Sequence, residues 1–463
     1  MKTFRSGESR DQVSLLPPSI DEYVPVDDLV RYVDQLVEEF DLGLIESRYA
    51  AIGRPAYAPR MLVKVLLYGK MRGIRSGRDL ARACRENLRF IFLARNEKPD
   101  FRTINDFRKI HSSSLAGLLR QTIEIGIAEN LIDLKQVCID GTKLAASAGR
   151  RSFKTPKNLQ AELSELEREL KQSFEADNER DKEDDERYGD DDDGDRKLPP
   201  DIKSKQDLRD RLRRALDEHS RCERKEKPEA ISTTDPECRM MKGKGVNPSY
   251  NAQAATDAKS RMAVGGYVVN ACCDSSELIP MIDQIEELTG RTPELASTDK
   301  GYTKLAHLLE LERRGIDGYI SQRERRKQDF NYDAPRDLYI CPEGKELHCI
   351  ERRPGFSRYA ISACGDCARK PKCWRENASQ RTVCVTDNED AARRMRFKVL
   401  SEKGKEISRL RASTIEPLFG TIKFAKRLRQ FAVRGLKRVS ETWELELAAY
   451  NVEKLCRFRA TAA

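Results

Sequence analysis

The sequence has no long apolar run and few residues of the types that build many enzyme sites. No stretch approaches the roughly 20 apolar residues that cross a bilayer, and the opening MKTFRSGESRDQVSLLPP lacks the apolar core of a signal peptide. We therefore expect no membrane contact and a protein that stays where it is made. Only four histidines occur, and none forms a recognisable nucleophile motif with a serine or cysteine, which argues against hydrolase triad chemistry.

The charge balance points to a polyanionic partner. The 463 residues include 86 Lys and Arg against 77 Asp and Glu, and the block DKEDDERYGDDDDGD concentrates part of the acid. Outside that block the chain is distinctly basic, which suits nucleic acid, although many basic proteins bind none. Thirteen cysteines, an odd number, argue against a disulfide framework and for thiols or metal ligands.

Residues 26–125 have the apolar spacing of helices. In YAPRMLVKVLLYGKMRGIRSGRDLARACREN an apolar stripe ends at Gly73, and Ser76 is placed to cap a second helix. This pattern predicts a helix-turn-helix rich in basic residues, among them Arg75, Arg78 and Arg82. DNA binding and an ordinary helical bundle with a solvated basic face explain that charge equally well.

Strand and helix patterns then alternate, which predicts an α/β sheet. In QVCIDGTK we expect Gly141 to give a turn and Asp140 to stand at a strand end. In PELASTDKGY, Asp299 ends another strand, before a turn at Gly301 and Tyr302. Acids at strand ends lie at the edge of such a sheet where ligands usually bind, although an Asp that merely starts a turn is more common.

Two segments interrupt this order. In residues 157–227, leucines recur every third or fourth residue on both sides of the acidic block, which predicts an inserted charged helical hairpin with a disordered tip. Strand patterns resume at YNAQAATD and MAVGGYVVNACC, where we expect Cys272 and Cys273 to be buried. Residues 335–385 form the second insertion, which is rich in cysteine.

This second insertion is a candidate zinc site. Cys364 and Cys367 are separated by two residues, the bite that tetrahedral Zn²⁺ needs. A nearby basic run would lower the pKa of the thiols and favour the thiolates that zinc binds. The segment also has too few apolar residues for a core of its own. We therefore expect a structural zinc knuckle, with unmetallated thiols as the alternative, from Cys341, Cys364, Cys367 and Cys373.

The late segment RASTIEPLFGTIK places a carboxylate beside a buried helical face. Glu416 could complete a capping box with Ser413, although Pro417 would crowd the Ser413 carbonyl unless the helix starts later or bends. A helix cap, an exposed surface acid and a metal ligand all remain open on this stretch alone. Together with Asp140 and Asp299, Glu416 could form the hard oxygen site that Mg²⁺ prefers.

These fragments resemble a known family. VCIDGTKLAASAG, YNAQAATD, STDKGY and IEPLFGTIKFAKRLRQFAVRGLKRV resemble, in order, the catalytic domain of bacterial insertion-sequence transposases of the DDE class. MLVKVLLYGKMRGIRSGRDLARACRENLRFIFL and PDFRTINDFRK resemble the helical DNA-binding domain that precedes it. The resemblance implies a DNA-binding domain, all α, over residues 1–125. An α/β catalytic domain, with a ribonuclease-H-like mixed sheet flanked by helices, would cover residues 126–463 and carry both insertions.

The resemblance also implies a function. Asp140, Asp299 and Glu416 would bind Mg²⁺ or Mn²⁺ and catalyse strand cleavage and strand transfer between the element's terminal inverted repeats and target DNA. Lys423 matches a position that contacts DNA in relatives, and neighbouring basic residues would position the phosphates. The expected DNA-binding set is Lys423, Lys426, Arg427 and Arg429, with Arg75, Arg78 and Arg82. We expect a homodimer on DNA, in the bacterial cytoplasm at the nucleoid.

The sequence departs from the family at two places. Arg409 and Ala412 stand where some relatives have a Tyr and an Arg, and Arg411 is the nearest substitute. Lys300 follows Asp299 where a small residue is usual, and its charge could compete with a metal ion for the carboxylate. Both departures favour the alternative function, a catalytically retired transposase that acts as a non-enzymatic DNA-binding protein.

Overall fold

The structure of the protein is a computed structural model. It describes residues 19–49, 55–188, 200–222, 227–243, 245–321, 330–333, 335–353, 356–361, 364, 367–368, 373, 380–385 and 389–462. Contacts divide the chain into two units. The first comprises Met1–Gly126, Gly420–Arg429 and Glu441–Ala463, and the second comprises Ile127–Phe419 and Gln430–Ser440.

Helices make up the regular structure of the described part of the first unit, which confirms the expected all-α N-terminal region. Its last helix, α16 (Leu436–Ala462), returns from the far end of the chain to pack in the same unit. The N-terminal helices are α1 (Leu29–Glu38), α2 (Gly43–Glu46), α3 (Pro59–Met71), α4 (Gly77–Glu86), α5 (Leu88–Leu93), α6 (Phe101–Ile110), α7 (Ser112–Ala116) and α8 (Leu118–Ala128).

The turn between α3 and α4 forms as the sequence predicts. Gly73 adopts φ 70°, a conformation that strains residues with a Cβ. The Ser76 side chain caps α4 by accepting from the backbone N–H of Asp79 at 3.0 Å. Gly69 lets the two helices approach closely, because a Cβ there would clash with Cδ2 of Leu80. The result is a compact helix pair joined by a tight turn.

A buried ion cluster fastens this helix pair to α16. Glu446 is fully buried and accepts from Lys70, which is 5% exposed, and from Arg75 Nη2 at 2.5 Å. Arg108 donates from Nη1 to the backbone carbonyl of Arg75 at 3.1 Å. Burial alone would raise the pKa of Glu446, but the charges of Lys70 and Arg75 outweigh it and lower the pKa to about 2.

A six-stranded mixed sheet forms the centre of the second unit. Its order is β4-β5-β1-β7-β8, with β6 also paired to β5. Strand β1 is antiparallel to β5 and parallel to β7, and β7 is parallel to β8. The strands are β1 (Val137–Ala145), β4 (Arg239–Gly243), β5 (Gly245–Asp257), β6 (Ala263–Val269), β7 (Leu295–Thr298) and β8 (Asp317–Ile320). The α/β fold class expected from the sequence is therefore confirmed.

Helices cover both faces of this sheet. Gly265 of β6 faces α11 (Leu278–Thr289), where a Cβ would lie 3.1 Å from Sδ of Met281. Asp140 of β1 faces α15 (Glu402–Gly420), from which Arg411 reaches it. Gly265 pairs with Ala255, Ala255 with Ile139, and Ile139 is adjacent to Asp140. Because successive residues of a strand point to opposite faces, α11 and α15 lie on opposite faces of the sheet.

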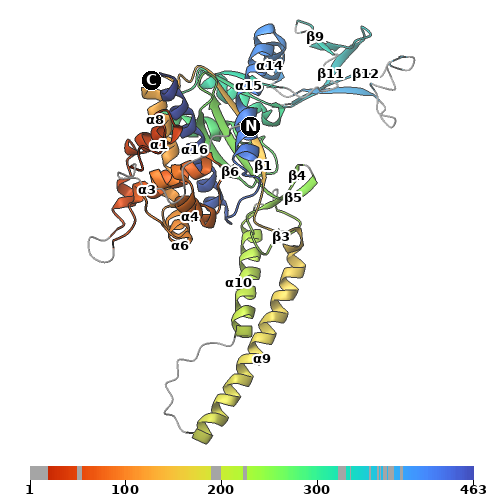
Figure 1. Ribbon diagram of the computed structural model, residues 1–463. Coiled ribbons are helices and arrows are strands. Elements are labelled where there is room, and N and C mark those ends of the chain that lie inside the picture. The colour runs from red at the N-terminus through yellow and green to blue at the C-terminus, as the bar shows by residue number, and fades with distance from the viewer. Residues whose placement is uncertain are drawn as a thin grey trace, which may run out of the picture. The chain divides into compact units, whose positions relative to one another are not determined.

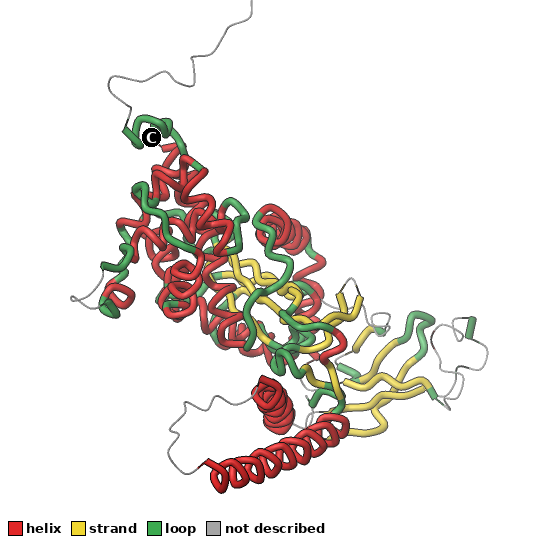
Figure 2. Tube along the Cα trace, turned by 60° about the horizontal axis from the view of Figure 1, so that its bottom comes forward, coloured by secondary structure: helices red, strands yellow, loops and turns green. Residues whose placement is uncertain are grey.

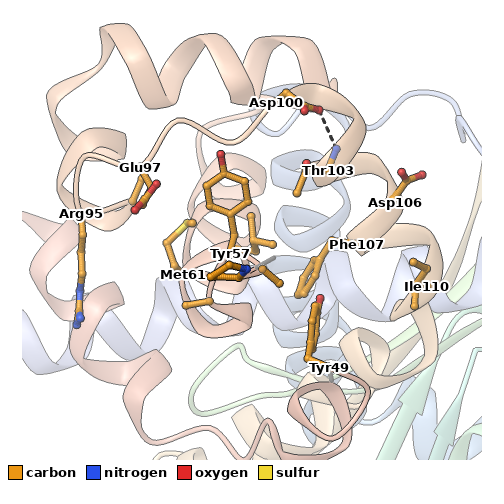
Figure 3. Close-up of a pocket in the computed structure, with 15 residues that line it drawn as sticks. Tyr49, Tyr57, Met61, Arg95, Glu97, Asp100, Thr103, Asp106, Phe107 and Ile110 are labelled. Carbon is orange, nitrogen blue, oxygen red and sulfur yellow. Dashed lines mark hydrogen bonds between the residues drawn. The ribbon is translucent and has the colours of Figure 1, made fainter. Parts of the chain in front are cut away.

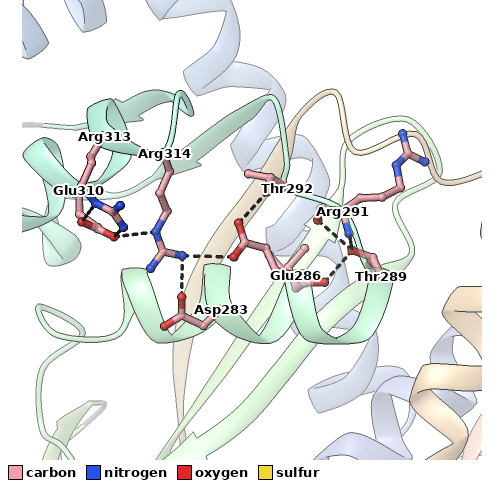
Figure 4. Close-up of polar contacts among 9 residues, drawn as sticks. Asp283, Glu286, Thr289, Arg291, Thr292, Glu310, Arg313 and Arg314 are labelled. Atoms are coloured by element: carbon pink, nitrogen blue, oxygen red, sulfur yellow. Dashed lines mark hydrogen bonds and ion pairs between the residues drawn. The ribbon is translucent and has the colours of Figure 1, made fainter.

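Polar contacts tie α11 to α12 (Leu305–Arg313). The Arg314 side chain follows the end of α12 and donates to Asp283 at 2.6 Å and to Glu286 at 3.4 Å, both on α11 (Figure 4). It also donates from Nε to Glu310 at 2.7 Å. One guanidinium thus joins α11, which follows β6 in the chain, to α12, which follows β7.

The expected inserted hairpin is present as two long helices, α9 (Pro156–Tyr188) and α10 (Pro200–Arg221). They run side by side in both views (Figures 1 and 2). Their own apolar cluster holds them together, and it includes Leu159, Leu166, Leu170, Leu212 and Ala215. At the base, β2 (Phe153–Lys154) pairs with β3 (Ile231–Ser232). The predicted disordered tip lies outside the described residues.

Replacing residues 157–227 by a short Gly/Ser bridge should leave the rest of the protein folded. The hairpin leucines pack mainly on one another, and the β2–β3 pair at its base closes the break. Circular dichroism and thermal unfolding of the deletion variant should show one cooperative transition within a few degrees of the parent. Loss of cooperative unfolding would show that the hairpin belongs to the core of the second unit.

The cysteine-rich insertion folds as a small antiparallel sheet. Its strand order is β13-β12-β11-β10-β9, from β9 (Asn331–Asp333), β10 (Leu338–Ile340), β11 (Glu346–Arg353), β12 (Phe356–Ile361) and β13 (Arg381–Val385). Phe330, Tyr339, Leu347, Tyr359 and Val383 form its buried cluster. The expectation that this segment has no core of its own was therefore wrong, because tyrosines supply much of the apolar contact.

The second unit also contains helix α14 (Glu389–Leu400). None of the described helices is long and apolar enough to cross a membrane.

Candidate active site

Two of the three predicted acids are neighbours in the structure. Ile139 of β1 pairs with Thr298 of the parallel strand β7, so Asp140 and Asp299 continue from adjacent positions. Asp299 caps a short 3₁₀ turn, η2 (Lys300–Tyr302), and its Oδ1 accepts from the backbone N–H of Gly301 at 2.7 Å. Asp140 Oδ1 accepts from the backbone N–H of Gly141 at 2.8 Å. Parallel pairing thus brings two carboxylates to one edge of the sheet.

The electrostatics of Asp140 reflect this crowding. Burial, and after it the negative charge of Asp299, raise the pKa of Asp140 to about 6. Arg411 opposes this effect and donates from Nη1 to Asp140 Oδ2 at 3.1 Å. A carboxylate whose pKa is raised by burial and by a neighbouring carboxylate is typical of a site that binds positive charge.

Asp140 is not at a strand end, which corrects the expectation from the sequence. Strand β1 continues through Gly141 to Ala145 because β5 pairs with it along its whole length. Only the parallel partner β7 stops beside Ile139. Gly141 therefore makes no turn; it leaves room for side chains, since a Cβ there would lie 2.6 Å from Asp274 Oδ1 and closer still to Gln253 Nε2.

The third predicted acid, Glu416, lies exposed on α15. The predicted apolar face beside it is confirmed, because Ile415, Leu418 and Ile422 are fully buried. The capping-box alternative is excluded, since the helix begins at Glu402 and Ser413 lies well inside it. Pro417 is an interior proline, so the Ser413 carbonyl lacks its usual helical donor. A surface acid and a metal ligand remain as the two interpretations of Glu416.

No metal-binding cluster is complete in the described part of the chain. Nowhere in it do three Asp, Glu, His or Cys side chains converge closely enough to hold one ion. The cationic partner at the Asp140–Asp299 pair is Arg411, which is 15% exposed. Lys300, expected to compete for Asp299, is exposed in η2. Asp140 and Asp299 offer the hard oxygen donors that Mg²⁺ takes, but Arg411 occupies one of those oxygens.

The predicted basic residues gather within the first unit but differ in accessibility. Arg78 and Arg82 of α4 are exposed, and so are Arg427 and Arg429. The guanidinium of Arg429 lies over the Phe424 ring, 5.5 Å from its centroid. Lys423 is half-buried, and burial lowers its pKa. The segment that carries Arg427 lies against the α3–α4 turn, since a Cβ on Gly73 would lie 3.0 Å from the Ala425 carbonyl and 3.6 Å from the Arg427 side chain.

Two other predicted DNA contacts are engaged inside the unit. Arg75 binds Glu446 and donates from Nη1 to the Lys426 carbonyl at 3.0 Å. Lys426 is 1% exposed and pairs with Glu453 at 3.0 Å. In this arrangement both side chains hold the basic segment against the helix pair.

The four cysteines predicted to bind zinc lie near one another. Burial and the neighbouring Cys367, Cys341 and Cys373 raise the pKa of the Cys364 thiol, while Lys345 lowers it. The basic run that was expected to lower the pKa of these thiols lies outside the described residues. Cys341 Sγ accepts from the backbone N–H of Lys345 at 3.3 Å. The four thiols are therefore neighbours, but no three of them lie close enough together to coordinate one metal ion.

A further acid, Asp274, lies at this edge of the sheet and was not among the residues predicted from the sequence. Asp274 follows β6 in a loop that had been interpreted as the end of a strand, and Cys272 and Cys273 before it are exposed rather than buried. A Cβ on Gly301 would lie 2.8 Å from Asp299 Oδ1 and 3.4 Å from Asp274 Oδ2. The polar run Asp-Ser-Ser-Glu after the cysteines was the signal that could have found it.

A separate pocket lies in the first unit (Figure 3). Tyr57, Met61 and Phe107 line it, with the carboxylates of Glu97 and Asp106 among its polar groups. None of the predicted site residues lines this pocket. Its acidic groups would repel phosphates, so we assign it no part in DNA binding.

Comparison with known proteins identifies the family. Residues 340–456 match the family described as a transposase DDE domain, and residues 18–110 match a second family described as a transposase domain. No curated protein and no solved structure matches the chain. These two matches indicate an insertion-sequence DDE transposase, and the DDE domain implies a family of polynucleotidyl transferases and nucleases. The transposase family implies that the chain binds DNA. Both matches leave out Asp140 and Asp299.

Proposed function

We propose that this transposase catalyses metal-dependent strand cleavage and strand transfer at the ends of an insertion sequence, with Asp140, Asp299 and Glu416 as its acids. The adjacency of Asp140 and Asp299 across β1 and β7 is the observation that supports this most strongly. A bound Mg²⁺ or Mn²⁺ would activate water and then the freed 3′-hydroxyl for in-line attack. Arg411 must release Asp140 Oδ2 for that oxygen to face a cation.

The strand order supports a ribonuclease-H-like assignment for this sheet. Three antiparallel strands, β1, β5 and β6, are followed in the chain by the parallel strands β7 and β8 on the other side of β1. We retain residues 1–125 as the proposed DNA-binding domain and 126–463 as the proposed catalytic domain. Gly420–Arg429 and Glu441–Ala463 would then belong to the catalytic domain while packing in the first unit.

DNA contacts are proposed for the exposed basic residues around the α3–α4 turn. Arg78, Arg82, Arg427 and Arg429, together with Lys423, would bind phosphates of the terminal inverted repeats and target DNA. Arg75 and Lys426 would act by holding that surface in shape. We further propose that two chains assemble on paired element ends at the nucleoid.

A DNA-nicking assay tests this function. The sequence that flanks the gene supplies the inverted repeats for a labelled end duplex. We expect cleavage at the element boundary with Mg²⁺ or Mn²⁺ and none with EDTA. The ion pair between Arg411 and Asp140 favours the second candidate, a retired transposase that binds DNA without cutting it. Binding of the end duplex without cleavage in either metal would establish that alternative.

Protein purified without added metal should contain about one zinc ion per chain, the stoichiometry of a four-thiolate structural site. The gathered thiols of Cys341, Cys364, Cys367 and Cys373 would hold it. Elemental analysis measures the zinc, and a Cys367→Ser variant should lose it. Cys84→Ser, at a buried cysteine of the first unit, is the matched control. Near-zero zinc with freely titratable thiols would rule out the knuckle.

A further inference from the structure

Asp274 is held by three donors at the candidate active site. It lies between β6 and α11, and its Oδ1 accepts from Asn251 Nδ2 at 2.6 Å and from Gln253 Nε2 at 2.7 Å. Lys143 Nζ approaches the same oxygen at 3.4 Å. Asn251 and Gln253 are fully buried on β5, opposite Lys143 and Gly141 of β1. The carboxylate therefore accepts from two buried side-chain amides of one strand.

The contact needs a glycine at position 141. Gly141 sits directly opposite Gln253 in the antiparallel pair, and any Cβ would meet both Gln253 and Asp274. The residue after the candidate acid Asp140 is therefore fixed by the packing of Asp274 and Gln253 against β1. This places the Asp274 network on the α11 face, while Asp140 points to the α15 face.

Gln253 connects Asp274 to the turn that carries Asp299 through a second hydrogen bond. The buried Tyr302 hydroxyl donates to Gln253 Oε1. Burial, and then the charges of Asp274, Asp140 and Asp299, raise the pKa of Tyr302, which keeps its hydroxyl protonated as a donor. With Oε1 accepting from Tyr302, the Gln253 amide must present Nε2 to Asp274. Each hydrogen bond thus fixes the direction of the next.

We propose that Asp274 is a positioning residue for Asp299, acting through Gln253 and Tyr302. Tyr302 is the last residue of η2, and Asp299 is the cap of the same turn. Anchoring the buried Tyr302 side chain to β5 fixes where the turn ends, and hence where the Asp299 carboxylate stands beside Asp140. The proposal rests on the proposed function for its consequence in catalysis, but its structural content can be measured without activity.

Two substitutions at residue 274 distinguish positioning from direct metal binding. Asp274→Asn keeps an oxygen that can accept from both amides, whereas Asp274→Leu has a similar shape and no acceptor. Positioning predicts that the Asn variant stays within a few-fold of the parent and the Leu variant does not. A metal ligand would lose its function in both variants, because an amide is a poor replacement for a carboxylate at Mg²⁺.

Tyr302→Phe interrupts the relay at its other end. Its matched control is Tyr250→Phe, at a buried tyrosine on the opposite face of β5 from Gln253, whose hydroxyl donates to Asp235 Oδ1 at 2.8 Å. Hydrogen exchange of the peptide that spans residues 298–304 should become about five- to tenfold faster in Tyr302→Phe and Asp274→Leu, as expected for one lost hydrogen bond. Asp274→Asn and Tyr250→Phe should leave that peptide unchanged.

Unchanged exchange of this peptide in Tyr302→Phe would overturn the proposal, even if Asp274→Leu fails to fold. Mn²⁺ affinity and single-turnover cleavage form the second readout. In variants with a loosened turn, both should weaken while the dissociation constant for the end duplex stays the same. A parent protein that neither binds Mn²⁺ nor cuts would defeat the proposed function and leave the exchange result to decide the positioning role.

Discussion

Asn in place of Asp140 or Asp299, or Gln in place of Glu416, should lower metal-dependent cleavage by roughly 10³-fold or more, as expected when a ligand of a catalytic metal is removed. Each change keeps the size of the side chain and removes one anionic oxygen donor. DNA affinity should stay within a few-fold of the parent, because the proposed phosphate contacts come from the basic residues of the first unit. Single-turnover cleavage and end-duplex binding should be measured on the same preparations.

Glu406→Gln is the matched control for Glu416→Gln. Glu406 is also an exposed glutamate of α15, and it has no proposed part in the site. Cleavage by this variant should equal that of the parent. Retention of full cleavage in Asp140→Asn, Asp299→Asn or Glu416→Gln would remove that residue from the proposed set of acids.

The fold class could be predicted because its signals are local. Alternating apolar residues marked the strands that carry Asp140 and Asp299, and the leucine spacing marked α9 and α10. The extent of β1 could not be read in the same way. Gly141 has the sequence appearance of a turn, and only its pairing with Gln253 shows that the strand continues.

The resemblance to the family singled out Glu416 as a candidate metal ligand. The local sequence pattern also allowed a helix cap there, which the structure excludes. Ser413 and Glu416 have the spacing of a capping box, yet α15 begins at Glu402 and carries Pro417 in its interior. A helix of this length tolerates one missing hydrogen bond when its apolar face is buried, as Ile415 and Leu418 are. The tertiary packing that decides this is not visible in a thirteen-residue window.

The missed acid shows a different limit. Asp274 is recognisable only after β5, β6 and the Asp299 turn are placed together, since its partners are 21 to 23 residues earlier in the chain. The basic residues show the same limit, because Arg75 and Lys426 were expected at a DNA surface but pair with Glu446 and Glu453 inside the first unit. Sequence gives the charge of a side chain but does not give the group that it meets.

Glu446 links α16 to the end of α3 and the turn that follows it, and its loss should have the largest effect on stability. Its carboxylate has no exposure to solvent and neutralises Lys70 of α3 and Arg75 of the α3–α4 turn. Removing it leaves two cations without their partner, and one of them, Lys70, is also buried. Burial lowers the pKa of Lys70 to about 8, against the opposing charge of Glu446. We therefore expect Glu446→Gln to destabilise the first unit by roughly 3–5 kcal/mol, the usual cost of breaking a buried ion pair.

Urea unfolding of Glu446→Gln should be compared with that of Glu39→Gln. Glu39 belongs to the same unit and pairs with Arg459 at its surface, where the loss should stay below about 1 kcal/mol. The pH dependence of unfolding stability adds a second measurement. The pKa of Glu446 is lowered to about 2 in the folded chain, against about 4.3 when unfolded. Its contribution to stability is therefore complete above about pH 4.3 and disappears as the pH falls through about 2. The parent should lose more stability than Glu446→Gln across that window, because the variant has no carboxylate to protonate. Equal acid sensitivity of the two proteins, or a cost at neutral pH no greater than that of Glu39→Gln, would show that Lys70 and Arg75 find other partners and that the cluster does not join α16 to the helix pair.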